Sequence, residues 1–122
     1  MIRFTVPMRP FPKQRPRSAA GKRPYMDKGY VLQKVEFATL ARAAYGKPFP
    51  FLLGKVEVSI TFRYKDNRTA DIDNLAGGVM DALNGLLWKD DKQVRRGKLA
   101  IETACPRNEI EMWINELEAV NV

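Results

Sequence analysis

The feature that most constrains the fold is a strict alternation of residue types from Lys55 to Tyr64. The apolar positions are Val56, Val58, Ile60, Phe62 and Tyr64, and every residue between them is polar. Side chains of a β-strand point alternately to its two faces, so this period of two predicts a strand with one buried face. The chain therefore needs a second layer of structure that covers this apolar face.

The rest of the pattern predicts further strands and two helices. Alternation predicts strands at residues 2–6, 93–104 and 109–116, and apolar residues at helical spacing predict helices at residues 30–45 and 74–86. The connection Pro106-Arg107-Asn108 favours a hairpin between the last two strands. The order β-α-β-α-β-β predicts an α+β fold, a single small domain over residues 1–122 with two helices packed on one mixed β-sheet.

The residue types that are missing limit the chemistry. Histidine is absent and Cys105 is the single cysteine. An internal disulfide and a zinc site built on several thiolates are therefore excluded. Without an imidazole, hydrolysis would have to use carboxylates, lysine, hydroxyls or a metal ion. No apolar run approaches the roughly 18 residues of a membrane span, and no apolar block of signal-peptide length follows the N-terminus, so we expect neither membrane insertion nor secretion.

The positive charge is concentrated in one proline-rich stretch, residues 7–30. This stretch holds seven cations and one acid, which gives +6 of the net charge of +7. Its five prolines exclude a regular helix or a central strand. A stiff, cationic loop suits a polyanion such as a phosphate backbone, and a merely solvated surface loop is the alternative. The cations are Arg9, Lys13, Arg15, Arg17, Lys22, Arg23 and Lys28.

Asp71 and Asp73 form an Asp-x-Asp motif at the start of the second predicted helix. If the backbone is extended there, both carboxylates point the same way, with α-carbons roughly 6.5 Å apart. Such a pair repels unless a cation lies between its members, and Mg²⁺ binds carboxylates together with waters and phosphate oxygens. Helix capping is the alternative, and it explains Asp73 better than Asp71.

Two further features of the same region need an explanation. The pair Asp90-Asp91 follows the helix, where acids oppose the helix dipole, so it indicates either a functional role or a turn built by the two residues. Gly77 and Gly78 lie inside the predicted helix, where each costs about 1 kcal/mol relative to alanine. Either DNA or another backbone approaches them closely, or the helix packs tightly on the sheet.

Taken together, these motifs resemble one known family. Its pattern is matched by Asp71-Ile72-Asp73-Asn74-Leu75, by Asp81-Ala82-Leu83, by Trp88-Lys89-Asp90-Asp91 followed by Gln93-Val94, and by the basic string from Pro12 to Arg17. The chain is similar in these runs to the RusA family of Holliday junction resolvases. The resemblance implies a homodimeric endodeoxyribonuclease that binds four-way DNA junctions and nicks two opposing strands in recombination and repair. It also implies Mg²⁺ as cofactor, with Mn²⁺ as a substitute.

The resemblance implies site residues as well. The three catalytic and metal-binding aspartates of the family fall on Asp71, Asp73 and Asp91, and the seven cations of residues 7–30 become DNA contacts. Candidate supporting residues are Asn74, Asp90 and Lys92. One departure concerns a functional lysine, because its position, four residues beyond Asp73, is Gly77 here. Either another cation serves, with Lys89, Lys92 and Lys98 as candidates, or none does.

Two other functions stay open at this point. The chain could be a non-catalytic nucleic-acid-binding module, in which the acids only cap and turn, or a metal nuclease without junction preference. Phe11, Tyr25 and Phe49 are candidates for exposed aromatic residues that open a junction, with core packing as the alternative. We expect a cytoplasmic protein encoded by a bacterium or an integrated phage.

Overall fold

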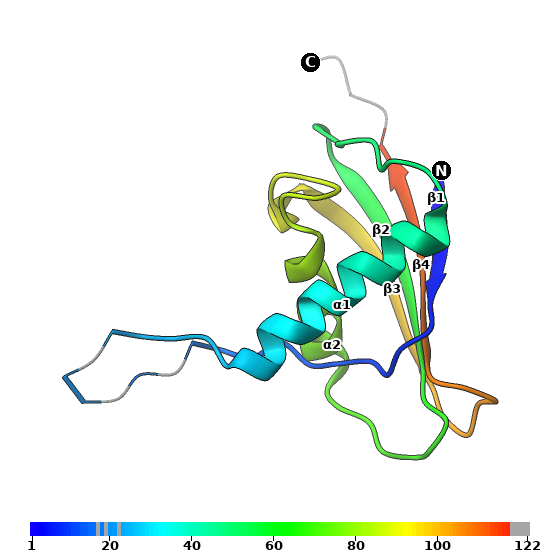
Figure 1. Ribbon diagram of the computed structural model, residues 1–122. Coiled ribbons are helices and arrows are strands. Elements are labelled where there is room, and N and C mark those ends of the chain that lie inside the picture. Colours follow the sequence, from blue (N-terminus) through cyan, green and yellow to red (C-terminus); the bar gives the residue numbers. More distant parts are fainter. Residues whose placement is uncertain (17, 19, 22, 118–122) are drawn as a thin grey trace.

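The structure is a computed structural model that describes residues 1–16, 18, 20, 21 and 23–117. Its elements, labelled in Figure 1, are β1 (Ile2–Val6), α1 (Lys28–Tyr45), β2 (Val56–Arg63), α2 (Ile72–Leu83), the short 3₁₀ helix η1 (Asp91–Gln93), β3 (Val94–Glu102) and β4 (Glu109–Glu116). The predicted order of strands and helices and the α+β class are confirmed. Arg17 and Lys22, both predicted DNA contacts, lie outside the described residues.

The four strands form one mixed sheet in the order β1-β4-β2-β3. β4 is antiparallel to both β1 and β2, whereas β2 and β3 are parallel. The predicted hairpin between the last two strands is therefore wrong. α2 joins β2 to β3 as a crossover, which makes that pair parallel and leaves β3 at the edge. Burial explains the choice, since β4 buries Ile110, Met112 and Ile114 and takes a central place, while the basic, exposed β3 suits an edge.

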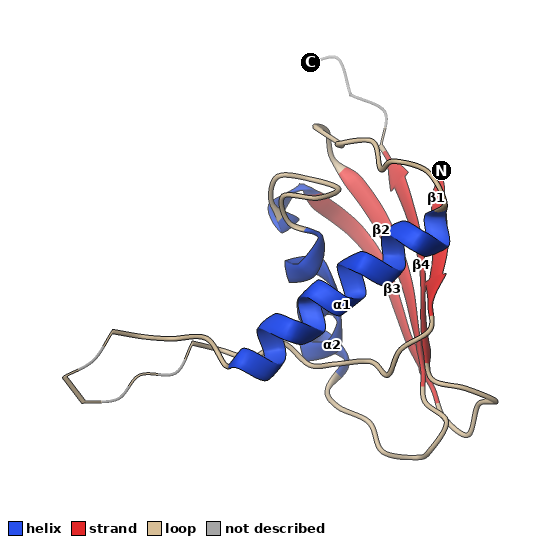
Figure 2. Cartoon of the chain, in the orientation of Figure 1, coloured by secondary structure: helices blue, strands red, loops and turns tan. Residues whose placement is uncertain are grey.

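Both helices lie on the same side of the sheet, as Figure 2 shows. The alternation in β2 is confirmed, because its apolar residues are all buried on the side that the helices cover. Phe37 and Ala41 come from α1, and Leu75, Val79 and Leu83 come from α2. The two helices and the sheet thus share one apolar core. Within the described residues, no helix combines the length and apolar character needed to cross a membrane.

The basic stretch is only partly a free loop. Met8, Pro10 and Phe11 are buried, and Lys28 is already the first residue of α1, so the loop ends earlier than predicted. Phe11 is 1% exposed, which rules it out as an exposed aromatic, whereas Tyr25 is 53% exposed. Phe49 is half-buried. In Figure 1 the described residues that flank the grey segments project away from the sheet and helices.

Candidate active site

Asp71 and Asp73 lie at the N-terminus of α2. Asp71 is the residue before the helix, with extended backbone angles (φ −62°, ψ 135°), while Asp73 is in the first helical turn. The condition that both residues are extended is met by Asp71 alone, because the helix already begins at Ile72. The two carboxylates leave the chain from different backbone conformations and still share one helix end, where the helix dipole favours negative charge.

Neither carboxylate has a structural task that the described residues reveal. Asp71 occupies the capping position but makes no side-chain capping hydrogen bond to the helix it precedes. Within the described part of the chain, the carboxylates of Asp71 and Asp73 make no hydrogen bond or ion pair, and both residues are exposed. Helix capping, the alternative reading of the motif, thus accounts for neither side chain. Their oxygens are open to a ligand.

Asp90 and Asp91 differ in their structural roles. The Asp90 carboxylate accepts from the backbone N–H of Lys92 at 2.9 Å, and the Gln93 side chain accepts from the backbone N–H of Asp90 at 3.2 Å. This reciprocal capping box starts η1. The turn-building reading is therefore right for Asp90. Asp91, one residue later, takes no part in the box.

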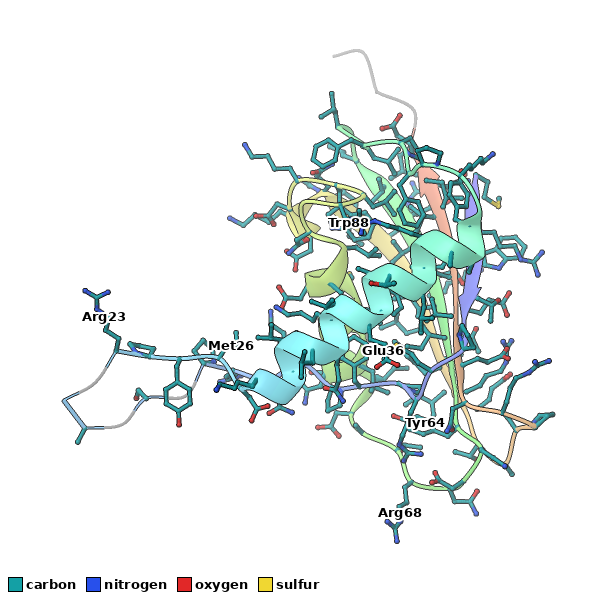
Figure 3. The ribbon with its side chains drawn as sticks, in the orientation of Figure 1. Arg23, Met26, Glu36, Tyr64, Arg68 and Trp88 are labelled. Carbon is teal, nitrogen blue, oxygen red and sulfur yellow. The ribbon has the colours of Figure 1, made fainter. Side chains whose placement is uncertain are left out.

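A buried tryptophan fixes the segment that carries Asp91. Trp88, labelled in Figure 3, is fully buried, and its indole N–H donates to the Asn84 side chain at 2.8 Å. The Gln93 side chain donates to the backbone oxygen of Leu52 at 2.8 Å. These contacts hold the chain between α2 and β3 against the loop before β2. Asp91 is thereby presented from a defined turn.

The pKa of Asp91 responds to charges on α2 and on the basic stretch. Burial, the hydrogen bond with Asp90 and repulsion from that neighbour raise the pKa of the Asp91 carboxyl, while the charge of Lys13 lowers it and that of Asp81 raises it further. The charges that act on Asp91 come from Lys13 and from Asp81, near the C-terminal end of α2, and the meeting of Asp91 with Asp71 and Asp73 stays a prediction. In the described part of the chain, however, no three acidic or cysteine side chains lie close enough together to hold a metal ion.

Asp81 is a site neighbour that the sequence reasoning did not single out. Its carboxylate accepts from the Tyr30 hydroxyl at 2.8 Å and from the Lys34 ammonium at 3.0 Å. Burial raises the pKa of Asp81, but the hydrogen bonds from Lys34 and Tyr30 outweigh it, so the pKa is lowered overall. This cluster ties α1 to α2. No sequence signal beyond the family-like Asp81-Ala82-Leu83 run could have indicated it, because its partners come from the other helix.

The paired glycines of α2 are explained by the basic stretch. A Cβ added at Gly78 would lie 2.8 Å from the backbone oxygen of Phe11, so another backbone does approach this position. A Cβ added at Gly77 would lie 3.2 Å from Cδ of Lys13. The backbone N–H of Lys13 donates to the backbone oxygen of Asn74 at 2.8 Å. Residues 11–13 thus lie directly on α2 between Asn74 and Gly78.

The predicted DNA-contacting residues differ in whether their side chains are engaged within the fold or exposed to solvent. Arg9 is engaged within the fold, because it donates to Asp66 at 3.0 Å and its guanidinium lies 4.9 Å from the centre of the Tyr64 ring. Arg15, Arg23 and Lys28 are exposed. Figure 3 shows Arg23 on the segment that projects from the body of the molecule. A hollow lined by Lys13, Gln14, Arg15, Pro16 and Asn74 lies where this segment meets α2.

With this geometry in hand, the comparison with protein families decides the affiliation. Residues 7–113 match the family model described as Endodeoxyribonuclease RusA. The chain belongs to this family. The match spans the basic stretch, both helices, the turn with Asp91 and most of β4. A comparison with curated individual proteins gives no match.

The affiliation agrees with the chemistry of the exposed acids. RusA-family proteins are endodeoxyribonucleases, so the cationic stretch and the acids beside it belong to a protein that acts on DNA. Carboxylate oxygens are the ligands that Mg²⁺ prefers, and one or two carboxylates with waters and substrate phosphate suffice to bind it. The unengaged pair Asp71 and Asp73 therefore fits this ion. The assignment of Asp71, Asp73 and Asp91 as one metal site stays a prediction.

Proposed function

We propose that the protein is a Mg²⁺-dependent endodeoxyribonuclease that resolves four-way DNA junctions by paired symmetric nicks in recombination and repair. The observation that carries the proposal is the position of Asp71 and Asp73 in a RusA-family chain. Both carboxylates are exposed at the start of α2, and neither is engaged by the described residues. The position of exposed acids beside a cationic, DNA-binding stretch is explained if the acids act on the phosphate that the cations bind.

In this proposal Asp71 and Asp73 hold the ion, with Asp91 as the third acid. The ion, Mg²⁺ or Mn²⁺ in its place, would polarise the phosphoryl oxygen and activate the attacking water. The chain has no histidine to act as general base. The chain's own contribution is therefore to position the phosphate and to orient the acids. The α2 N-terminus offers backbone N–H groups to a phosphate, and Asp90 and Gln93 hold the turn that presents Asp91.

The exposed cations supply affinity and orientation. Arg15, Arg23 and Lys28 would bind phosphates, and such contacts position the duplex without reading its sequence. Arg17 and Lys22 are assigned to the same role from the sequence. A four-way junction has approximate two-fold symmetry, and matched nicks on opposing strands need two equivalent active sites. A two-fold homodimer provides them.

The deciding experiment separates binding from cleavage. We expect Asp71→Asn and Asp73→Asn to bind a four-way junction with unchanged affinity and to lose cleavage by at least about 100-fold, because each removes a charge needed only in the reaction. The matched control is Glu36→Gln, which changes an exposed acid on α1 (Figure 3) and should cleave normally. Binding is measured by gel shift without divalent metal, and cleavage with Mg²⁺.

The competing functions give different results in the same assay. A junction shift without any nicked product, with or without Mg²⁺, would support a non-catalytic binding module. Equal cleavage of junction, duplex and single strand would support a nuclease without junction preference. Cleavage by Asp71→Asn and Asp73→Asn at the wild-type rate would remove the catalytic assignment.

A further inference from the structure

Lys13 occupies space over α2 that a side chain at position 77 would otherwise fill. A Cβ built on Gly77 would lie 3.2 Å from Cδ, 3.4 Å from Cβ and 3.9 Å from Cγ of Lys13. Three successive carbons of the lysine stem thus run across the helix at this glycine. Any larger residue at position 77 would displace the stem. The glycine, costly inside a helix, is what allows the lysine to lie there.

The backbone holds Lys13 in this position. Its backbone N–H donates to the backbone oxygen of Asn74 at 2.8 Å. Two residues earlier, Phe11 is buried, and its backbone carbonyl lies against Gly78. The start of the lysine stem is therefore fixed by the packing of the stretch on α2. A cation on such an anchored stem is better positioned than one on a solvated loop.

Lys13 lies beside the part of α2 that follows Asp71 and Asp73, because its backbone contacts Asn74 and its stem contacts Gly77. Its positive charge lowers the pKa of Asp81, farther along the same helix. Among the described residues, however, Lys13 is not within ion-pair distance of the Asp81 or Asp91 carboxylate; the ion pair of Asp81 is with Lys34. In the described part of the chain, the Lys13 ammonium therefore has no direct ion pair, which leaves it available to a phosphate. The hollow that Lys13 lines with Arg15 and Asn74 opens at the same place.

The other candidate lysines are placed less well. Lys89 and Lys92 act on Asp90, which already caps η1. Lys98 lies on the edge strand β3 and lines a hollow with Trp113 and Met1, beside the sheet. Of these four lysines, Lys13 is thus the one that lies against the first half of α2.

We propose that Lys13 is the lysine of the active site: its ammonium, carried by the basic stretch across Gly77, contacts the phosphate on which Asp71, Asp73 and Asp91 act. This inference rests on the proposed function. The lysine would stabilise the negative charge that grows on the phosphoryl oxygens, and no covalent bond to the protein forms. A residue missing from α2 is in this way replaced from another part of the fold.

The test compares cleavage at saturating protein with junction affinity. We expect Lys13→Gln to lower the single-turnover cleavage rate by about 100-fold, the typical loss when one donor to a developing charge is removed. Junction affinity, measured without divalent metal, should fall by less than about 10-fold, since one phosphate contact among several is lost. The control is Lys55→Ala, which removes an exposed lysine before β2 and should leave both quantities unchanged.

A transplanted lysine distinguishes this role from a structural one. In Lys13→Ala the stem beyond Cβ is gone, and Gly77→Lys then sends a new stem into the space it vacates. The double variant should regain at least about tenfold in rate over Lys13→Ala, because the charge returns from α2 to the same place. A purely structural role of Lys13 in holding the stretch on α2 would give no such rescue.

The remaining outcomes overturn the proposal. If Lys13→Gln lowers affinity alone and the rate at saturation stays at the wild-type value, Lys13 is an ordinary DNA-binding cation. If Lys13→Gln is inactive but the double variant shows no rescue, the placement over Gly77 is wrong. Failure of this inference is distinguishable from failure of the proposed function, because Asp71→Asn would still abolish cleavage if only the role of Lys13 is wrong. Absence of cleavage by the wild-type protein would overturn both proposals.

Discussion

At the scale of single residues, the two adjacent glycines of α2 face different neighbours and should respond differently to a methyl group. At Gly78 the added Cβ would meet the Phe11 backbone oxygen at 2.8 Å and its ring at 3.1 Å, whereas at Gly77 it would meet the flexible stem of Lys13. A backbone cannot give way as a lysine stem can. The sequence left open whether another backbone approaches the two glycines or the helix packs tightly on the sheet, and the contact at Gly78 favours the approach of a backbone.

We therefore expect Gly78→Ala to lower the free energy of unfolding by about 1–3 kcal/mol, despite the better helix propensity of alanine. Gly77→Ala is the matched control and should stay within about 1 kcal/mol of wild type, because the gain in helix propensity offsets a small shift of Lys13. Urea denaturation measures both. Equal losses in the two variants would contradict the contact between Phe11 and Gly78.

Asp91 offers a second residue-scale prediction, in which stability and activity change in opposite directions. Burial and the neighbouring Asp90 raise the pKa of Asp91, so the fold disfavours its charged form. The resulting destabilisation is fully present above the raised pKa and disappears below the ordinary value, where Asp91 is neutral in both folded and unfolded chains. Asp91→Asn should therefore unfold at higher urea than wild type at pH 7 without metal.

The same variant should lose cleavage if Asp91 is the third acid of the site. Its stability advantage should shrink as the pH falls toward 3, and thermal unfolding over a pH series measures this trend. Asp90→Asn is the informative neighbour, because it weakens the capping box of η1 and should lower stability at pH 7. An Asp91→Asn protein that is less stable than wild type at neutral pH would contradict this account.

At the scale of elements, the Tyr30–Asp81–Lys34 cluster ties α1 to α2. Tyr30 is buried, and its hydroxyl donates to the partly buried Asp81 carboxylate at 2.8 Å. Tyr30→Phe keeps the ring and removes the donor, so we expect a loss of about 1 kcal/mol in the free energy of unfolding. Tyr25→Phe, at an exposed tyrosine, should change nothing and serves as the control.

The pH dependence of this tie follows from the direction of the Asp81 shift. The pKa of Asp81 is lowered overall, since Lys34 and Tyr30 outweigh the effect of burial. The stability that it contributes is present above the ordinary carboxyl value of 3.8 and is lost as the pH falls through the lowered pKa. The penalty of Tyr30→Phe should thus be larger at pH 7 than at pH 2.5, as measured by urea unfolding.

At the scale of the whole molecule, most of the net positive charge comes from residues 7–30, and this stretch should control DNA binding. Junction affinity should fall steeply with salt, with a slope of about −0.9 for each phosphate contact. We expect Arg15→Gln and Arg23→Gln each to reduce the slope by about 1. Arg107→Gln, at an exposed arginine before β4, is the control. Fluorescence anisotropy over a salt series measures the slopes, and unchanged slopes in both variants would contradict DNA binding by this stretch.

Much of the architecture was predictable because burial repeats with the period of each element. The alternation in β2 and β4 and the helical spacing after Tyr30 and after Asn74 fixed the order of elements. The pairing of β3 and β4 was mispredicted, because adjacency in sequence favours a hairpin and only the burial of β4 moves it to the centre of the sheet. The extended backbone that would align the two carboxylates of the Asp-x-Asp motif is present at Asp71 alone, since the helix starts between the two aspartates.

The sequence by itself determined the class of the fold, the missing imidazole, the cationic stretch and the acids that a polyanion-cleaving protein would need. These properties are local, so residue types and their spacing suffice to state them. Only the tertiary structure decided that Phe11 is buried and that Lys13 lies over Gly77. Each of these depends on which distant segments pack together to bury apolar surface, and that choice is made by the whole core at once.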